Sequence, residues 1–68
     1  MRRKATFPAI LTALRESAKL TREDLASLSG LSRQAIHNYE TGERSPTWEA
    51  VQALAKALGV ATDTFRGG

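Results

Sequence analysis

Four polar residues with hydrogen-bonding side chains fall close together near the middle of the chain: Arg33, Gln34, His37 and Asn38. On a helix they would share one side, because at 100° per residue they cover an arc of roughly 140°. An arginine can bond guanine at two points, and a glutamine or asparagine can do the same with adenine. The spacing therefore predicts a helix face that can hydrogen-bond to base edges in a major groove, whereas a solvated helix face is the plainer alternative.

This polar face needs a helix to carry it, and the neighbouring residues favour one. Ser32 is a good N-cap for a helix over about 33–41, whose apolar side carries Ala35, Ile36 and Tyr39. The following "GERSP" is a turn, since glycine and proline both interrupt helices. The sequence thus predicts a short amphipathic helix with its apolar side packed inward and its polar side outward.

Apolar periodicity and capping residues predict the other elements, and no strand is expected. Helices are expected over about 7–18, 22–29 and 48–58, with a fifth, short one in "ATDTF" over 61–65. Thr21 and Asp24 suit a capping box at the start of the second helix, and Gly30 can close it in a left-handed conformation. Leu28 is expected on that helix's apolar side, and Trp48 is expected to cap the core or to stay partly exposed.

Composition limits the classes of protein that fit. The 68 residues allow one domain, and the absence of cysteine excludes disulfides and fits a reducing, cytoplasmic location. No apolar run approaches the roughly 20 residues of a membrane span. The net charge of +3 comes entirely from Arg2, Arg3 and Lys4, so it is weak evidence for a nucleic-acid partner. With one histidine and no catalytic set, we expect no metal, no cofactor and no enzymatic activity.

Two short helices joined by a tight glycine turn, the second polar on one face, describe a helix-turn-helix. From Leu14 to Phe65 the chain resembles the phage-repressor-like (Cro/xenobiotic-response-element) helix-turn-helix family, through "LTREDLASLSGLSRQAIHNYETGERSPTWEAVQALAKALGV". The resemblance implies an all-α, compact five-helix lambda-repressor-like domain over residues 7–66. It would follow a basic N-terminal arm, residues 1–6, which we expect to be flexible. This arm either follows the DNA or only aids solubility.

The resemblance also implies the DNA contacts. Base reading falls to the outward face of the third helix, which is Arg33, Gln34, His37 and Asn38, although His37 could meet only phosphate or water. Phosphate contacts fall to backbone amides near Gly42 and to the residues at the helix starts and turns: Arg22, Ser32, Arg44 and Lys19. Most relatives have glutamine where this chain has Arg22, so stronger salt dependence is expected. Glu43 is unfavourable beside a phosphate, and Lys19 could simply be solvated.

Two further expectations follow from the resemblance and concern structure more than DNA. Arg15 and Glu40 would form an ion pair between the first and third helices, which sets the angle of the reading helix. The alternative is a surface Glu40 with a local partner, and such pairs contribute little. Leu58, Val60 and Phe65 would form the interface of a two-fold homodimer, or else belong to the core of the single chain.

The expected function is that of a sequence-specific DNA-binding transcriptional regulator that binds a two-fold operator on double-stranded DNA, with repression favoured over activation. Half-sites would lie about one helical turn apart, near 34 Å. The alternative is a protein-interaction module, an antitoxin or adaptor that uses the same fold to hold another protein. Co-purification with a second protein would favour that alternative.

Overall fold

The structure is a computed structural model that describes residues 6–65. Its elements are, in chain order, α1 (Phe7–Ser17), α2 (Arg22–Ser29), α3 (Arg33–Thr41), α4 (Trp48–Leu58) and η1 (Thr62–Phe65). The last element is one 3-10 turn, so the prediction of five helices is wrong, and the described part of the chain has four α-helices. Within these residues there is no strand, and no helix is long and apolar enough to cross a membrane.

Capping residues define where each helix begins and ends. Each α-helix follows a hydroxyl residue whose side chain accepts a hydrogen bond from the backbone of the first turn: Thr6, Thr21, Ser32 and Thr47. At α2 the capping box is complete, since Asp24 Oδ2 accepts the Thr21 N–H at 3.0 Å. Gly30 closes α2 at φ +77°, a left-handed conformation that side chains rarely adopt, and this tight turn aims α3.

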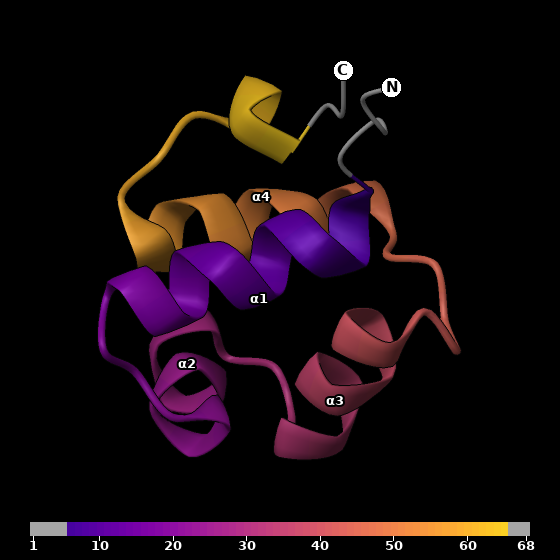
Figure 1. Ribbon diagram of the computed structural model, residues 1–68, viewed down its shortest axis with the longest axis horizontal. Coiled ribbons are helices and arrows are strands. Elements are labelled where there is room, and N and C mark those ends of the chain that lie inside the picture. The colour runs from indigo at the N-terminus through magenta and orange to yellow at the C-terminus, as the bar shows by residue number, and fades with distance from the viewer. Residues whose placement is uncertain (1–5, 66–68) are drawn as a thin grey trace, which may run out of the picture.

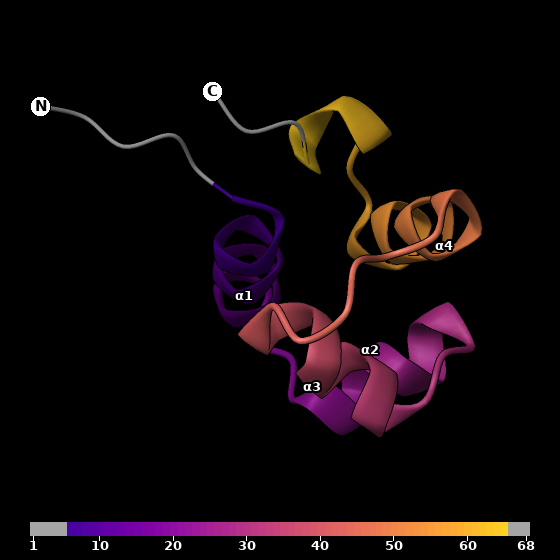
Figure 2. The same cartoon turned by 90° about the vertical axis from the view of Figure 1, so that its right-hand side faces the viewer.

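The helices are arranged around one small core. In Figure 1, α1 and α4 form a middle layer, with η1 on one side and α2 and α3 on the other, and Figure 2 shows the same order from the side. The four fully buried side chains come one from each α-helix: Leu11, Leu25, Ile36 and Leu54. Because α3 contacts both α1 and α2, its position depends on packing from two sides.

Three apolar residues differ from the sequence prediction or settle an open choice. Leu28 is 60% exposed, so its expected place on the packed side of α2 is wrong. Trp48 is 59% exposed at the start of α4, which settles the choice in favour of exposure. Phe65 is buried, with its ring centroid 5.1 Å from that of Phe7, so η1 completes the core of the single chain.

Candidate nucleic-acid interface

The outward face of α3 carries the four residues predicted to read bases. Arg33 and Gln34 are exposed, while His37 and Asn38 are half-buried. Gln34 Nε2 donates a hydrogen bond to Asn38 Oδ1 at 3.0 Å, one turn along the helix. This bond orients both amides and leaves the Gln34 oxygen as an acceptor and the Asn38 amino group as a donor. The pair is therefore ordered before any ligand arrives.

A cleft of about 480 Å³ opens beside this face, between the N-terminal ends of α2 and α3. Its walls come from three helices and their caps: Arg15, Thr21, Arg22, Glu23, Arg33, Gln34 and His37. The structure thus brings one predicted phosphate-binding residue, Arg22, to the same hollow as three predicted base-reading residues. Three arginines line the hollow, against Glu23 on its wall and Glu40, which binds two of the arginines, and the remaining positive charge favours an anionic ligand.

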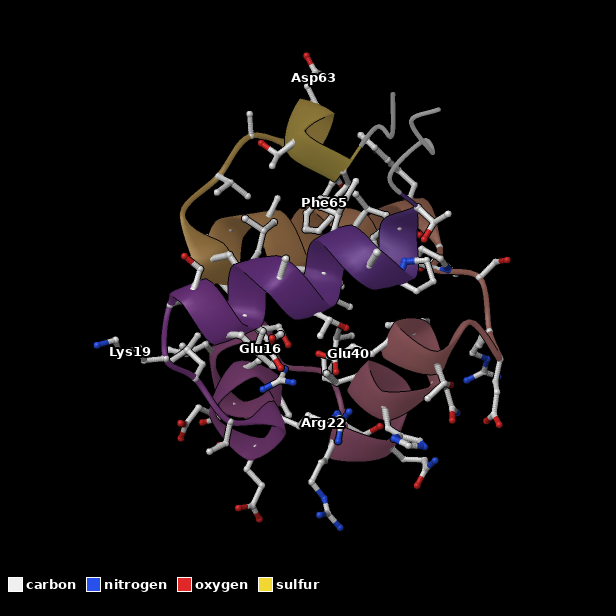
Figure 3. All side chains as sticks on the ribbon, viewed as in Figure 1. Glu16, Lys19, Arg22, Glu40, Asp63 and Phe65 are labelled. Carbon is white, nitrogen blue, oxygen red and sulfur yellow. The ribbon has the colours of Figure 1, made fainter. Side chains whose placement is uncertain are left out.

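The other predicted phosphate contacts lie outside this cleft. Ser32 caps α3, and its oxygen accepts the Ala35 N–H at 3.0 Å, which leaves the hydroxyl proton available for donation. Lys19 lies in the turn between α1 and α2, and Figure 3 shows its side chain pointing away from α3. The cleft therefore does not include all the predicted positive residues.

The turn after α3 is tied back to the helix by its own backbone. The amides of Gly42, Glu43 and Arg44 all donate to the Asn38 carbonyl oxygen, the last two at 3.0 and 3.3 Å. Backbone amides near Gly42 were expected to bind phosphate, but they are already used within the chain. The exposed Arg44 side chain is what this turn can offer to a phosphate.

The predicted ion pair between α1 and α3 is present and nearly buried. Arg15 Nε lies 2.6 Å from Glu40 Oε2, Arg15 Nη2 lies 3.2 Å from Glu40 Oε1, and Arg15 Nη1 donates to the Leu20 carbonyl oxygen at 2.9 Å. The hydrogen bond to Glu40 raises the pKa of Arg15 above its ordinary value. A two-point arginine–carboxylate contact fixes orientation as well as distance, so the pair sets how α3 sits on α1.

Glu40 has a second partner that the sequence did not predict. Arg22 Nε donates to Glu40 Oε1 at 2.9 Å, and Figure 3 shows these two side chains directed toward each other from α2 and α3. The two residues are 18 positions apart, and no local pattern links them. The sequence offered one related signal, the predicted pairing of Glu40 with Arg15, but it did not point to Arg22 as a second partner.

The predicted dimer residues have different surroundings. Leu58 and Val60 are half-buried against the core, whereas Phe65 is a core residue of the single chain. Phe65 also lines a mainly apolar hollow of about 200 Å³. The hollow is lined by residues at the starts of α1 and α4 and in η1: Phe7, Trp48, Val51, Thr62, Asp63 and Phe65. Among the residues described, no group of three or more histidine, cysteine or acidic side chains could hold a metal ion.

Comparison with known proteins gives consistent matches. Residues 9–66 match the family described as a helix-turn-helix domain. An uncharacterized HTH-type transcriptional regulator of Sinorhizobium fredii, y4dJ, is 43% identical over 47 residues, which are 69% of this chain and 61% of that protein. The match thus spans less than two thirds of the length of this curated relative.

Solved structures agree with the fold. The restriction-modification controller protein C.AhdI from Aeromonas hydrophila is similar at a TM-score of 0.86 and 33% identity, over 88% of this chain and 91% of that one. The DNA-binding domain of the P22 c2 repressor is similar at a TM-score of 0.88 and 28% identity, over 94% of this chain and 84% of that one. The P22 c2 repressor in complex with a synthetic operator is similar at a TM-score of 0.83 and 30% identity, over 90% of this chain and 92% of that one.

Proposed function

We propose that this chain, which belongs to the helix-turn-helix domain family, is a DNA-binding transcriptional regulator that lays α3 in the major groove. The resemblance to repressors noted in the sequence is confirmed by the family match and by the repressor and controller structures. The observation that carries the proposal is the outward face of α3, where Gln34 and Asn38 are joined at 3.0 Å beside the cleft. An ordered polar face on a protruding helix fits the donor and acceptor patterns of bases.

Base reading is assigned to the four polar residues of α3. Arg33, at the first position of α3, suits guanine, and the joined amides of Gln34 and Asn38 suit adenine. His37 lies half-buried on the wall of the cleft and contributes to a neighbouring base or phosphate. Because buried Ile36 and Tyr39 anchor the opposite side, these side chains share one rigid support.

Backbone phosphates are assigned to Arg22 at the start of α2, Ser32 at the N-cap of α3 and Arg44 in the turn after α3. Such contacts fix the register of a protein on the duplex and carry no sequence information directly. Lys19 is not included, because its side chain points away from α3 (Figure 3). The basic arm, residues 1–6, lies almost wholly outside the described residues, and only Thr6 is seen, as the N-cap of α1.

A two-fold dimer is part of the proposal, with half-sites about 34 Å apart on the operator. Leu58 and Val60 are the interface residues we propose, because they are apolar, only partly buried and adjacent at the end of α4. Occupancy of an operator suffices to block a promoter, so repression is the proposed mode, and a DNA partner supports the proposed cytoplasmic location. Sedimentation of a Leu58→Lys variant tests the interface: it should stay monomeric at concentrations where the wild type dimerises on the duplex.

The experiment that tests the function is selection from a pool of random duplex DNA, followed by sequencing. The wild type should enrich a two-fold sequence, and Gln34→Ala and Asn38→Ala should each lose definition at particular positions within it. Lys56→Gln, at an exposed position of α4, is the matched control and should enrich the wild-type sequence. Failure of the wild type to enrich any sequence would overturn the proposal and direct the search to a protein partner.

A further inference from the structure

Glu40 is shared by two arginines that come from different helices. Its side chain is 2% exposed, and its Oε1 accepts from Arg15 Nη2 at 3.2 Å and from Arg22 Nε at 2.9 Å. Arg15 donates all three of its guanidinium nitrogens, two to Glu40 and one to the Leu20 carbonyl oxygen. Arg15 alone therefore satisfies the charge of the buried carboxylate, and Arg22 is not needed to neutralise it.

Arg22 is the part of the cluster that still has free donors. Two arginines that share one carboxylate carry a net charge of +1. The side chain of Arg22 is 42% exposed, against 12% for that of Arg15. Among the described residues, neither terminal nitrogen of Arg22 makes a hydrogen bond. Arg22 also lines the cleft, together with Arg33 and Gln34. The surplus positive charge is thus placed where an anion can reach it.

We propose that Glu40 is a positioning residue for DNA binding, which holds Arg22 by its Nε so that the two terminal nitrogens bind one backbone phosphate. This inference rests on the proposed function and adds a role for a carboxylate that simple electrostatics would count as repelling DNA. The guanidinium is planar and presents donors on two edges, so it can bridge a carboxylate and a phosphate at once. Fixing it beforehand reduces the side-chain entropy lost on binding.

The substitution that tests this most cleanly is Arg22→Lys, because it keeps the charge and leaves the bond between Arg15 and Glu40 intact. A lysine ammonium is a point charge and has no second edge with which to bridge the two anions. Arg22→Lys should therefore weaken binding nearly as much as Arg22→Gln, by about fivefold to tenfold per bound protomer. The probe is the duplex enriched by the wild type, at fixed salt concentration.

Salt dependence gives a second readout that a merely structural role would not change. For Arg22→Gln, the slope of log K against log salt should fall by about 0.9 per protomer, the value for one lost phosphate contact. Lys56→Gln is the matched control, since it removes one positive charge from an exposed position of α4, and its slope should be that of the wild type. Thermal unfolding of each variant shows the folded fraction under the binding conditions.

A pair of carboxylates separates positioning from plain repulsion. Glu23 and Glu40 both lie near the cleft, but only Glu40 bonds Arg22. Glu23→Gln should strengthen DNA binding, since it removes a negative charge from the wall. Glu40→Gln should weaken it, and this loss should largely vanish when Arg22→Gln is already present. If Glu40→Gln does not fold, Arg22→Lys decides the question alone.

Three results would overturn the proposal. One is that the Arg22→Lys variant binds the duplex with the same affinity and the same salt slope as the wild type. Another is that Arg22→Gln lowers only the thermal stability and leaves DNA binding unchanged, which would make Arg22 a structural clamp. The last is that Glu40→Gln, in folded protein, strengthens binding as Glu23→Gln does. Because the wild type binds DNA in each of these cases, they contradict the role of Glu40 without contradicting the proposed function, which fails only if the wild type itself does not bind.

Discussion

Arg15 near the end of α1 and Glu40 near the end of α3 form a two-point ion pair, with Arg15 Nε 2.6 Å from Glu40 Oε2. The residues are 25 positions apart, and the carboxylate is almost completely removed from solvent. Removing Arg15 would leave this buried carboxylate with the more exposed Arg22 as its partner, which is costly. The pair therefore links the scaffold to the angle at which α3 is presented.

Substitution of Arg15 by methionine should lower the free energy of unfolding by about 3 kcal/mol, because Glu40 would keep only Arg22 as partner. Glu16 offers a matched control, since it lies 4.0 Å from Arg15 but is 67% exposed. Glu16→Gln should cost less than about 0.5 kcal/mol. Urea unfolding measures both, and equal effects of the two substitutions would contradict a structural role for the buried pair.

The hydrogen bond between Gln34 and Asn38 predicts coupled base reading. Each alanine substitution should weaken binding to the enriched duplex, by about 1–3 kcal/mol for a lost bidentate base contact. The double variant should lose less than the sum, with a coupling of about 0.5 kcal/mol or more, because loss of either amide also releases the other. Gln34→Ala combined with Arg44→Ala is the control, and the losses of binding free energy from these two substitutions should add. Additivity in the first pair would show that the amides act independently.

Asp24 predicts an acid-dependent contribution at the start of α2. Hydrogen bonds from the backbone and side chain of Thr21 lower the pKa of Asp24 below its ordinary value of 3.8. Because the folded pKa lies below the unfolded one, the stabilisation is fully present above pH 3.8 and is lost as the pH falls through the folded pKa. An NMR titration of the Asp24 carboxyl should give a midpoint below 3.8 in the wild type, shifted upward in Thr21→Ala. An unchanged midpoint in the variant would contradict the contribution of the Thr21 side chain, since alanine keeps the backbone N–H that donates to Asp24.

Two residues of α4 should respond very differently to truncation. Leu54 is fully buried, so Leu54→Ala should cost about 3 kcal/mol through lost burial and a cavity. Trp48 is 59% exposed, and Trp48→Ala should cost less than about 1 kcal/mol. Thermal or urea unfolding compares them. Iodide should also quench the fluorescence of this single tryptophan readily, and a shielded, blue-shifted emission would contradict its exposure.

The helices were predictable because their signals are local. The structure confirms the helix ends that capping residues mark: Thr21 with Asp24, Ser32 and Thr47 at starts, and Gly30 at the end of α2. The helix α1 differs from the prediction only in ending at Ser17. The last turn was harder, since four residues satisfy a helical pattern without being long enough for an α-helix.

Features that depend on packing between elements were not predictable in the same way. Leu28 has the spacing of a core residue, yet within residues 6–65 its side chain remains 60% exposed. The bond from Arg22 to Glu40 joins helices whose separation depends on the whole core, and the amides near Gly42 are consumed by a carbonyl one turn back. The resemblance supplied the pair of Arg15 and Glu40, but it gave no indication that a second arginine shares the carboxylate.

The measurement that tests the central claim most directly is an NMR titration of the labelled protein with the enriched duplex. If α3 enters the major groove, the largest chemical-shift changes should fall on the amides from Arg33 to Asn38, the side-chain amides of Gln34 and Asn38, and the first turn of α2. The residues of η1 should change little. Changes concentrated on α4 and η1, or no saturable change at all, would contradict the assignment of the α2–α3 face to DNA.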